Sequence, residues 1–211
     1  MSPYSVKIVT VGQLATNCYI VWDRVTLDAL IIDPGDDAEF ISDTLTKLKV
    51  FPRAVIATHG HFDHVLAAFA LETMYNIPFM MHPADGFLLK SMKKSATYYL
   101  HIQHVDPPPH AVVPVSDGQH ITLGKSEITI LETPGHTPGS ICLYEERHRV
   151  IFTGDTVFAS GAVGRTDRSY GDRTLLLESL RKIFALPPNT ALFPGHGEAS
   201  TIGAEKSHHV V

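Results

Sequence analysis

The stretch Thr58-His59-Gly60-His61-Phe62-Asp63-His64 places three imidazoles and one carboxylate within six consecutive residues. Neutral imidazole and carboxylate are ligands that Zn²⁺ and related first-row metals prefer. The small apolar run Ala54-Val55-Ile56-Ala57 precedes this stretch and is typical of a buried strand, and residues 65–72 after it have a helical pattern. The cluster is therefore predicted at the carboxyl end of a strand, where open α/β sheets bind their ligands.

The spacing within residues 58–64, which we call the His cluster, indicates how metal would be held. Side chains alternate in an extended segment, so His59 and His61 point the same way and can chelate one metal together. Asp63 and His64 lie where the chain turns into the helix, and they can point at a second metal nearby. A carboxylate in this place can also orient a metal-bound water, which makes Asp63 the candidate catalytic residue. The alternative, a His-rich surface loop, is disfavoured by the intervening aspartate and the preceding buried strand.

Composition and charge narrow the class of protein. The chain has 211 residues, of which 44% are apolar and 18% charged, as in an ordinary globular protein with a single domain. Its net charge of −5 argues against nucleic acid or an anionic membrane as partner. No apolar run approaches the ~20 residues that span a bilayer, and residues 1–7 lack the pattern of a secretory signal. Cys18 and Cys142 lie in apolar runs and are predicted to be buried thiols, so a cytoplasmic location is expected.

Strands and helices are predicted along the whole chain from the spacing of apolar residues. The predicted strands are 6–11, 17–22, 29–33, 54–57, 77–81, 119–123, 128–131, 140–144, 150–153 and 191–193, and the predicted helices are 39–49, 65–72, 83–99 and 174–186. Residues 100–114 are predicted to be an irregular proline-rich loop with surface histidines, and residues 155–171 a second long loop. Periodicity alone indicates an α/β or α+β protein.

Three more polar residues directly follow predicted strands. They are His136 in Pro134-Gly135-His136, Asp155 in Thr153-Gly154-Asp155 and His196 in Pro194-Gly195-His196. A glycine beside each permits a close approach of the backbone. Together with the His cluster they supply five histidines and two aspartates, enough for two metals that share one carboxylate. Asp33, at the end of another strand, is either a partner of a metal-bound histidine or a turn-forming residue.

With these motifs the sequence resembles the metallo-beta-lactamase superfamily, from Asn17-Cys18-Tyr19 to Gly195-His196-Gly197, and within it the glyoxalase II group. The resemblance implies an α+β fold, a four-layer αββα sandwich of two mixed sheets with helices outside. It implies two divalent metal ions, for which zinc is expected and iron or manganese are alternatives. The implied ligands are His59, His61 and His136 on one metal and Asp63, His64 and His196 on the other, with Asp155 bridging both.

The resemblance also implies a reaction, the hydrolysis of thioesters of the S-D-lactoylglutathione type by a hydroxide that bridges the metals. The loop Gly164-Arg165-Thr166-Asp167 and the tail Thr201–Lys206 resemble single-domain glyoxalase II-like proteins. The long form of glyoxalase II carries a C-terminal helical domain that binds glutathione, and none is expected within residues 1–211. Arg165 and Lys206 are therefore candidate substrate-binding residues, and the alternative for Arg165 is that it and Asp167 order the loop by pairing with neighbouring groups. The expected partner is a small-molecule thioester, and the expected state is a monomer or homodimer.

Other activities share parts of this pattern. A persulfide dioxygenase, which resembles this family, would hold a single iron with His59, His136 and Asp155. A lactone or ester hydrolase, or a β-lactamase, would use the same hydroxide on another carbonyl. A nuclease is disfavoured by the negative charge. A binding protein without turnover is disfavoured because all seven ligand positions are filled.

Overall fold

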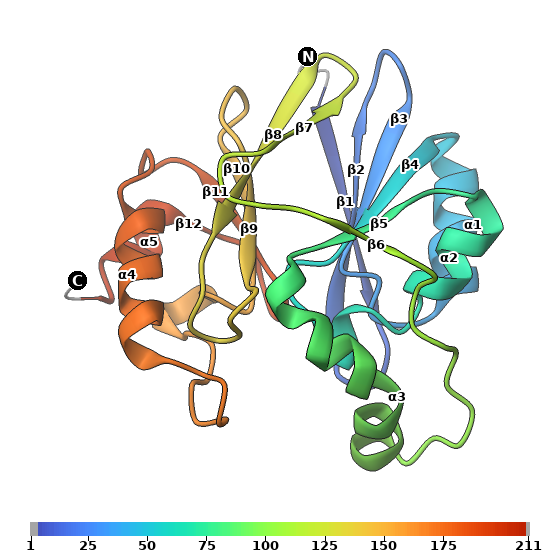
Figure 1. Ribbon diagram of the computed structural model, residues 1–211. Helices are drawn as coiled ribbons and strands as arrows, with labels where there is room; N and C mark the ends of the chain where they lie inside the picture. The colour runs from blue at the N-terminus through green and yellow to red at the C-terminus, as the bar shows by residue number, and fades with distance from the viewer. Residues whose placement is uncertain (1–3, 210–211) are drawn as a thin grey trace.

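Two six-stranded sheets form the centre of the computed structural model, which describes residues 4–209 (Figure 1). The single domain was expected over residues 1–211, and residues 1–3 and 210–211 of that range lie outside the described residues. The first sheet has the order β1-β2-β3-β4-β5-β6, with β1 Tyr4–Val11, β2 Thr16–Asp23, β3 Asp28–Ile32, β4 Phe51–Ile56, β5 Phe79–Met81 and β6 Val112–Pro114. The second has the order β12-β11-β10-β9-β8-β7, with β7 His120–Leu123, β8 Ser126–Glu132, β9 Ile141–Glu145, β10 Val150–Gly154, β11 Ala191–Pro194 and β12 Ser200–Thr201.

Helices cover the outer face of each sheet. Those beside the first sheet are α1 Ala38–Leu48, α2 Ala68–Tyr75 and α3 Gly86–Leu100, and those beside the second are α4 Arg173–Phe184 and α5 Ile202–Lys206. Figure 1 shows the two sheets face to face between these groups of helices. Both sheets are mixed, because β3, β4, β5 and β6 run parallel, as do β10 and β11, and the other pairs are antiparallel. The expected four-layer αββα sandwich is confirmed.

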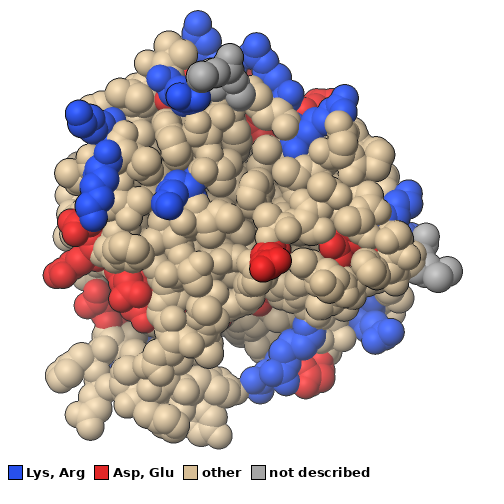
Figure 2. Space-filling model, turned by 180° about the vertical axis from the view of Figure 1, so that it is seen from behind, with Lys and Arg blue, Asp and Glu red and all other residues tan. Residues whose placement is uncertain are grey.

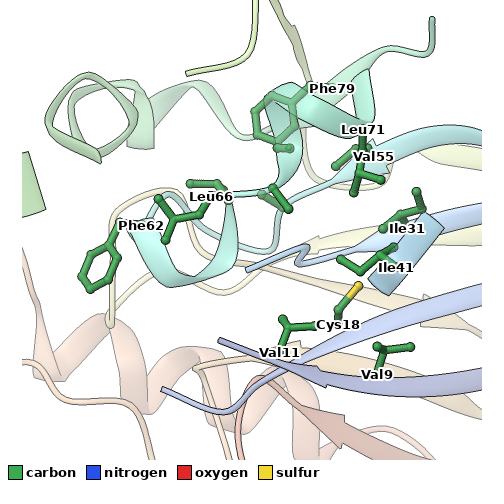
Figure 3. Packing of buried hydrophobic residues seen from close by; sticks show 14 of the residues in the cluster. Val9, Val11, Cys18, Ile31, Ile41, Val55, Phe62, Leu66, Leu71 and Phe79 are labelled. Carbon is green, nitrogen blue, oxygen red and sulfur yellow. The ribbon is translucent and has the colours of Figure 1, made fainter. Parts of the chain in front are cut away.

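The alternation of side chains along the strands explains the layers. In β2, Cys18 and Ile20 face the helices, whereas Tyr19 and Val21 face the other sheet. Both faces of β2 are therefore buried, which is why its sequence reads as a nearly unbroken apolar run. A third apolar cluster lies between the second sheet and α4. Figure 3 shows the cluster on the helix side of the first sheet, which includes Cys18, Ile41 and Val9, the residue of β1 paired with Cys18.

Both cysteines are free and fully buried, as expected. Burial raises the pKa of the Cys142 thiol to about 11, so this side chain stays protonated at neutral pH. Among residues 4–209 there is also no helix with the length and apolar character needed to cross a bilayer.

The predicted helix boundaries were wrong next to the His cluster. Phe62–His64 form a 3₁₀ turn, and α2 begins at Ala68 rather than at Val65. The segment between them is not helical because Val65 has φ −135° and ψ −1°, and the amide of Ala67 donates to the carbonyl of Pro34 in another loop. A side-chain pattern contains no information on that distant acceptor.

Several short elements were also missed, among them β6 and α5. Strand β6 lies within residues 100–114, where Val112 pairs with Phe79 of β5. It has three residues and ends in a proline. A strand this short does not contain enough residues to show the alternation of apolar and polar side chains by which a strand is predicted. In the tail, α5 begins after Thr201, whose hydroxyl accepts a hydrogen bond from the amide of Ala204.

Phe152 tests the contact between the two sheets. Its side chain is fully buried, and its ring centroid lies 5.0 Å from that of Tyr19 and 5.5 Å from that of Phe193. We expect Phe152→Ala to lower the free energy of unfolding by about 3–5 kcal/mol, because it leaves a cavity between the sheets. Urea denaturation measures this loss. Phe40→Ala, at a residue of α1 that is 52% exposed, is the control and should stay within about 0.5 kcal/mol of wild type. Equal losses in both variants would contradict the assignment of the core.

Candidate metal centre

All seven predicted ligands meet at one edge of the sandwich. They lie on four segments, which follow β4, β8, β10 and β11. The ligand atoms form three overlapping groups, and within each group they lie within 4.8 Å of one another. The groups are His59, His61 and His136; His59, His64 and Asp155; and Asp63, His64 and His196.

Three histidine nitrogens converge in the first group. Nδ1 of His61 lies 3.0 Å from Nε2 of His59 and 3.0 Å from Nε2 of His136. Nitrogens that bind one tetrahedral zinc at about 2.05 Å lie about 3.3 Å apart. The spacing therefore fits one first-row metal, and it bears out the geometric expectation that His59 and His61 point the same way. We call this the first metal position.

The second group begins in the 3₁₀ turn that follows His61. This turn points Asp63 and His64 toward His196, which follows β11. Oδ2 of Asp63 lies 3.4 Å from Nε2 of His196 and 3.8 Å from Nε2 of His64. The arrangement provides a second metal position beside the first.

Asp155 lies between the two positions. Its Oδ1 is 3.5 Å from Nε2 of His64, and its Oδ2 is 3.7 Å from Nε2 of His136 and 3.8 Å from Nε2 of His196. Both Asp155 Oδ1 and His64 Nε2 are buried without a hydrogen-bond partner among the described residues. Such atoms require an explanation, because an unpaired buried polar group costs free energy. Two divalent cations would satisfy both atoms, so the donor set fits a dinuclear metal centre.

The protein holds every histidine of the centre through its other ring nitrogen. The partners are Oγ1 of Thr58 at 3.1 Å for His59, the hydroxyl of Tyr170 at 2.9 Å for His61, Oδ2 of Asp33 at 3.0 Å for His64, the carbonyl of Arg165 at 2.9 Å for His136, and the carbonyl of Leu14 at 3.1 Å for His196. Each ring thus keeps one nitrogen directed at the centre.

Of the two alternatives for Asp33, the structure supports a hydrogen-bond partner of a ligand histidine. Its Oδ2 accepts hydrogen bonds from Nδ1 of His64 and from the hydroxyl of Thr58, and its Oδ1 accepts from the amide of Thr58. Because the Thr58 hydroxyl donates to Asp33, it accepts from Nδ1 of His59. One carboxylate therefore orients a ligand of each metal position.

Sequence reasoning missed three residues that hold the ligand loops. The buried carboxylate of Asp85 accepts from the amides of Gly60 and Gly139 and from the hydroxyl of Thr137, which joins the loops of His59 and His136. The side-chain amide of Asn17 donates to the carbonyls of Pro194 and Gly197 on either side of His196. Tyr170 contacts His61. Asp85 lies in a 3₁₀ turn at the start of the segment predicted as a helix, and no local pattern indicated its contacts or those of Asn17 and Tyr170.

The two candidate substrate-binding residues have structural contacts. The exposed guanidinium of Arg165 donates to both carboxylate oxygens of Asp167 at 2.6 Å, so the two residues pair with each other within the loop. The ammonium of Lys206 donates to the carbonyl of Phe184 at the end of α4, at 3.1 Å. The role of Arg165 and Lys206 in substrate binding stays a prediction.

Burial and charge set opposite protonation states within the centre. Burial, together with the neighbouring His136, lowers the pKa of His61 to about 3. Burial and His64 likewise lower the pKa of His59. Burial opposes a charge on His64 too, but the carboxylates of Asp155, Asp33 and Asp63 outweigh it and raise its pKa to about 10. Without metal, His59 and His61 are therefore neutral at pH 7 and His64 carries a proton.

This proton must leave when metal binds, since only a neutral imidazole is a ligand. Between about pH 7 and pH 9, we expect binding of two Zn²⁺ ions to release at least one proton per chain, and affinity to rise with pH until His64 is neutral near its pKa of about 10. Isothermal titration calorimetry in buffers of different ionisation enthalpy measures the release. Release of less than one proton per chain would contradict this charge assignment.

Gly195 allows the loop of His196 to pack closely against Asp155 and His64, and a substitution there tests whether metal binding needs this close packing. A Cβ at this position would collide with Oδ1 of Asp155 and lie 2.7 Å from Cε1 of His64. We expect Gly195→Ala to bind fewer than two metals per chain, as measured by elemental analysis after dialysis. Gly86→Ala, where a Cβ meets no heavy atom within 4 Å, is the matched control and should bind metal as wild type does. Full metal content in Gly195→Ala would show that Asp155 and His64 tolerate displacement.

Comparison with known proteins agrees with this geometry. The family model of the metallo-beta-lactamase superfamily matches residues 11–196. The hydroxyacylglutathione hydrolase GloC of Haemophilus influenzae is 34% identical over 208 residues, which cover 96% of this chain and 95% of that protein. Among solved structures, the BLEG-1 B3 metallo-beta-lactamase has a TM-score of 0.86 at 32% identity and covers 98% of each chain. TTHA1623 in a di-iron-bound form has a TM-score of 0.87 at 33% identity, covering 97% of this chain and 99% of that one. The chain belongs to the metallo-beta-lactamase superfamily.

Proposed function

We propose that this protein is a metal-dependent thioester hydrolase that cleaves substrates of the S-D-lactoylglutathione type to a hydroxy acid and a thiol. The observation that carries the proposal is the position of Asp155, one carboxylate within 3.8 Å of histidines from both metal positions. The similarity to a hydroxyacylglutathione hydrolase over nearly the whole chain supports the choice of substrate class.

Two divalent metals would bind at the two positions, where they would lower the pKa of a water and polarise the thioester carbonyl. His59, His61 and His136 would hold the first, Asp63, His64 and His196 the second, and Asp155 both. Zinc suits these donors, and so do iron and manganese. Iron gains support from the di-iron form of the similar protein TTHA1623.

Asp63 is the residue proposed to orient the attacking water. Burial opposes its charge, but His64 and His196 outweigh burial and lower its pKa, so the carboxylate is ionised at neutral pH. Its side chain is 16% exposed, which leaves it in reach of solvent. It can accept a hydrogen bond from water that adds to the thioester carbon. The C–S bond then breaks, and the thiol leaves with one of the two protons of the water.

Covalent catalysis by a cysteine has no support in the structure. Cys18 and Cys142 are fully buried, and burial raises the pKa of each thiol. A thiol attacks substrates as an accessible thiolate, which neither residue provides. Water is therefore the proposed nucleophile.

A small molecule is the proposed partner. Figure 2 shows Lys and Arg residues in separate groups, with Asp and Glu residues among them, on the face in view. This distribution and the net charge of −5 favour a small substrate over nucleic acid or an anionic membrane. Two free, buried thiols support the cytoplasm as the location. A monomer or homodimer stays the expected state.

The activity is tested with S-D-lactoylglutathione on protein of known metal content, by following the loss of thioester absorbance. We expect turnover in wild type and a loss of at least about 1,000-fold in His59→Ala and in Asp155→Asn, because a bound metal contributes several kcal/mol to the transition state. His104→Ala, at an exposed histidine, is the control and should keep wild-type activity. No turnover in protein that holds two metals would contradict this substrate class and direct the test to lactones, esters and β-lactams.

A persulfide dioxygenase is the second candidate, and the similarity to the solved structure of ETHE1 from Myxococcus xanthus, with a TM-score of 0.77 at 26% identity, supports it. It would need one iron on His59, His136 and Asp155, and Oδ2 of Asp155 lies 3.7 Å from Nε2 of His136. Oxygen uptake with glutathione persulfide, in protein that holds a single iron and does not cleave the thioester, would establish this activity instead.

A further inference from the structure

The loop of residues 164–172 forms hydrogen bonds to two of the three histidines of the first metal position. Each bond is to the ring nitrogen that faces away from the metal position. The carbonyl of Arg165 lies 2.9 Å from Nδ1 of His136, and the hydroxyl of Tyr170 lies 2.9 Å from Nε2 of His61. At the start of the loop, a Cβ on Gly164 would collide with the carbonyl oxygen of Asp155 and lie 3.0 Å from Cβ of His136. The loop thus packs directly against the metal ligands.

The contact of Tyr170 fixes the proton of His61. Nδ1 of His61 faces the ring nitrogens of His59 and His136, each at 3.0 Å, so this nitrogen must be unprotonated to bind a metal. The proton of the neutral ring then lies on Nε2, which donates to the Tyr170 hydroxyl. Without an acceptor on that side, the ring loses the contact that selects its metal-binding tautomer and its orientation.

Tyr170 is well placed to act on His61 alone. Its ring packs edge-on against Phe87 of α3, with 5.4 Å between the ring centroids, which holds the hydroxyl in position. The hydroxyl lies on the side of the imidazole that faces away from the converging nitrogens. It therefore acts through His61, and it is a positioning residue rather than a catalytic one.

We infer that the Tyr170 hydroxyl positions His61 and thereby sets the affinity of the first metal position, so that the loop of residues 164–172 is part of the metal centre. This inference rests on the dinuclear centre of the proposed function, but not on the thioester substrate. Loss of a hydrogen bond to a metal-bound histidine typically weakens metal binding 10- to 100-fold.

Tyr170→Phe, which removes only the hydroxyl, tests the inference in the full chain. Competition with a chromophoric chelator gives the two Zn²⁺ affinities. We expect one of them to fall about 10- to 100-fold and the other to stay as in wild type. The visible spectrum of the protein loaded with Co²⁺ is a second readout. We expect it to change in this variant, because a reoriented imidazole alters the ligand field, whereas a merely structural role would leave the spectrum as it is.

Tyr99→Phe is the matched control. Its hydroxyl also bonds a residue of this loop, since it accepts a hydrogen bond from the Arg168 guanidinium at 2.7 Å, but within residues 4–209 it forms no hydrogen bond with an imidazole. We expect both Zn²⁺ affinities and the Co²⁺ spectrum to match wild type in this variant. Thermal melting of the metal-free proteins shows whether either substitution disturbs the fold.

Either of two results would overturn the inference. One is a Tyr170→Phe protein with both Zn²⁺ affinities and the Co²⁺ spectrum of wild type. The other is an equal loss of affinity in Tyr170→Phe and Tyr99→Phe. A failure of the proposed function is distinguishable from both. In that case the wild-type protein would bind two metals tightly but would not hydrolyse the thioester, and the effect of Tyr170→Phe on metal binding would be unchanged.

Discussion

One hydrogen bond to the outer nitrogen of each ligating histidine underlies the whole centre. Five imidazoles crowd into one edge of the sandwich, where each could take either tautomer and several orientations. The partners of the outer nitrogens come from distant parts of the chain, from the carbonyl of Leu14 to the hydroxyl of Tyr170. They leave one nitrogen of each ring directed inward before any metal arrives. This prior order limits the entropy that metal binding must overcome, and it makes the affinity depend on residues that touch no metal.

The same edge is also where the two sheets are joined by polar contacts. The amide of Asn17, in the first sheet, donates to the carbonyl of Gly195 beyond the second, and the amide of Ile141 donates to the carbonyl of Thr58. Asp85 links the loops of His59 and His136 across the same boundary. The apolar layer between the sheets sets their separation, but these directional bonds set how one sheet is placed along the other. Metal binding and sheet packing are therefore coupled, since ligands from both sheets must meet.

Sequence reasoning succeeded where the signal was local. The apolar run before Thr58, the alternation of His59 and His61 and the glycine beside His196 are properties of neighbouring residues, and the structure brings the seven predicted ligands together. Periodicity alone indicated only an α/β or α+β class, and the four-layer arrangement followed from the family resemblance. What was missed depends on contacts distant in sequence. Tyr170 follows His61 by 109 residues, and Asp85 precedes Gly139 by 54, so no local pattern could pair them. The same holds for β6, which exists because β5 lies beside it.

The charges of the centre favour the chemistry proposed for it. Three carboxylates, from Asp33, Asp63 and Asp155, surround His64, and they stabilise a proton on its ring when no metal is present. Two dications would bring four positive charges and expel that proton. The carboxylates supply three negative charges and the imidazoles are neutral, which leaves one positive charge in a largely buried site. Such an excess favours loss of a proton from water at the centre, because the resulting anion restores neutrality. An eighth protein ligand with a negative charge would remove that excess, so the donor set of five histidines and two direct aspartates is suited to a hydrolase.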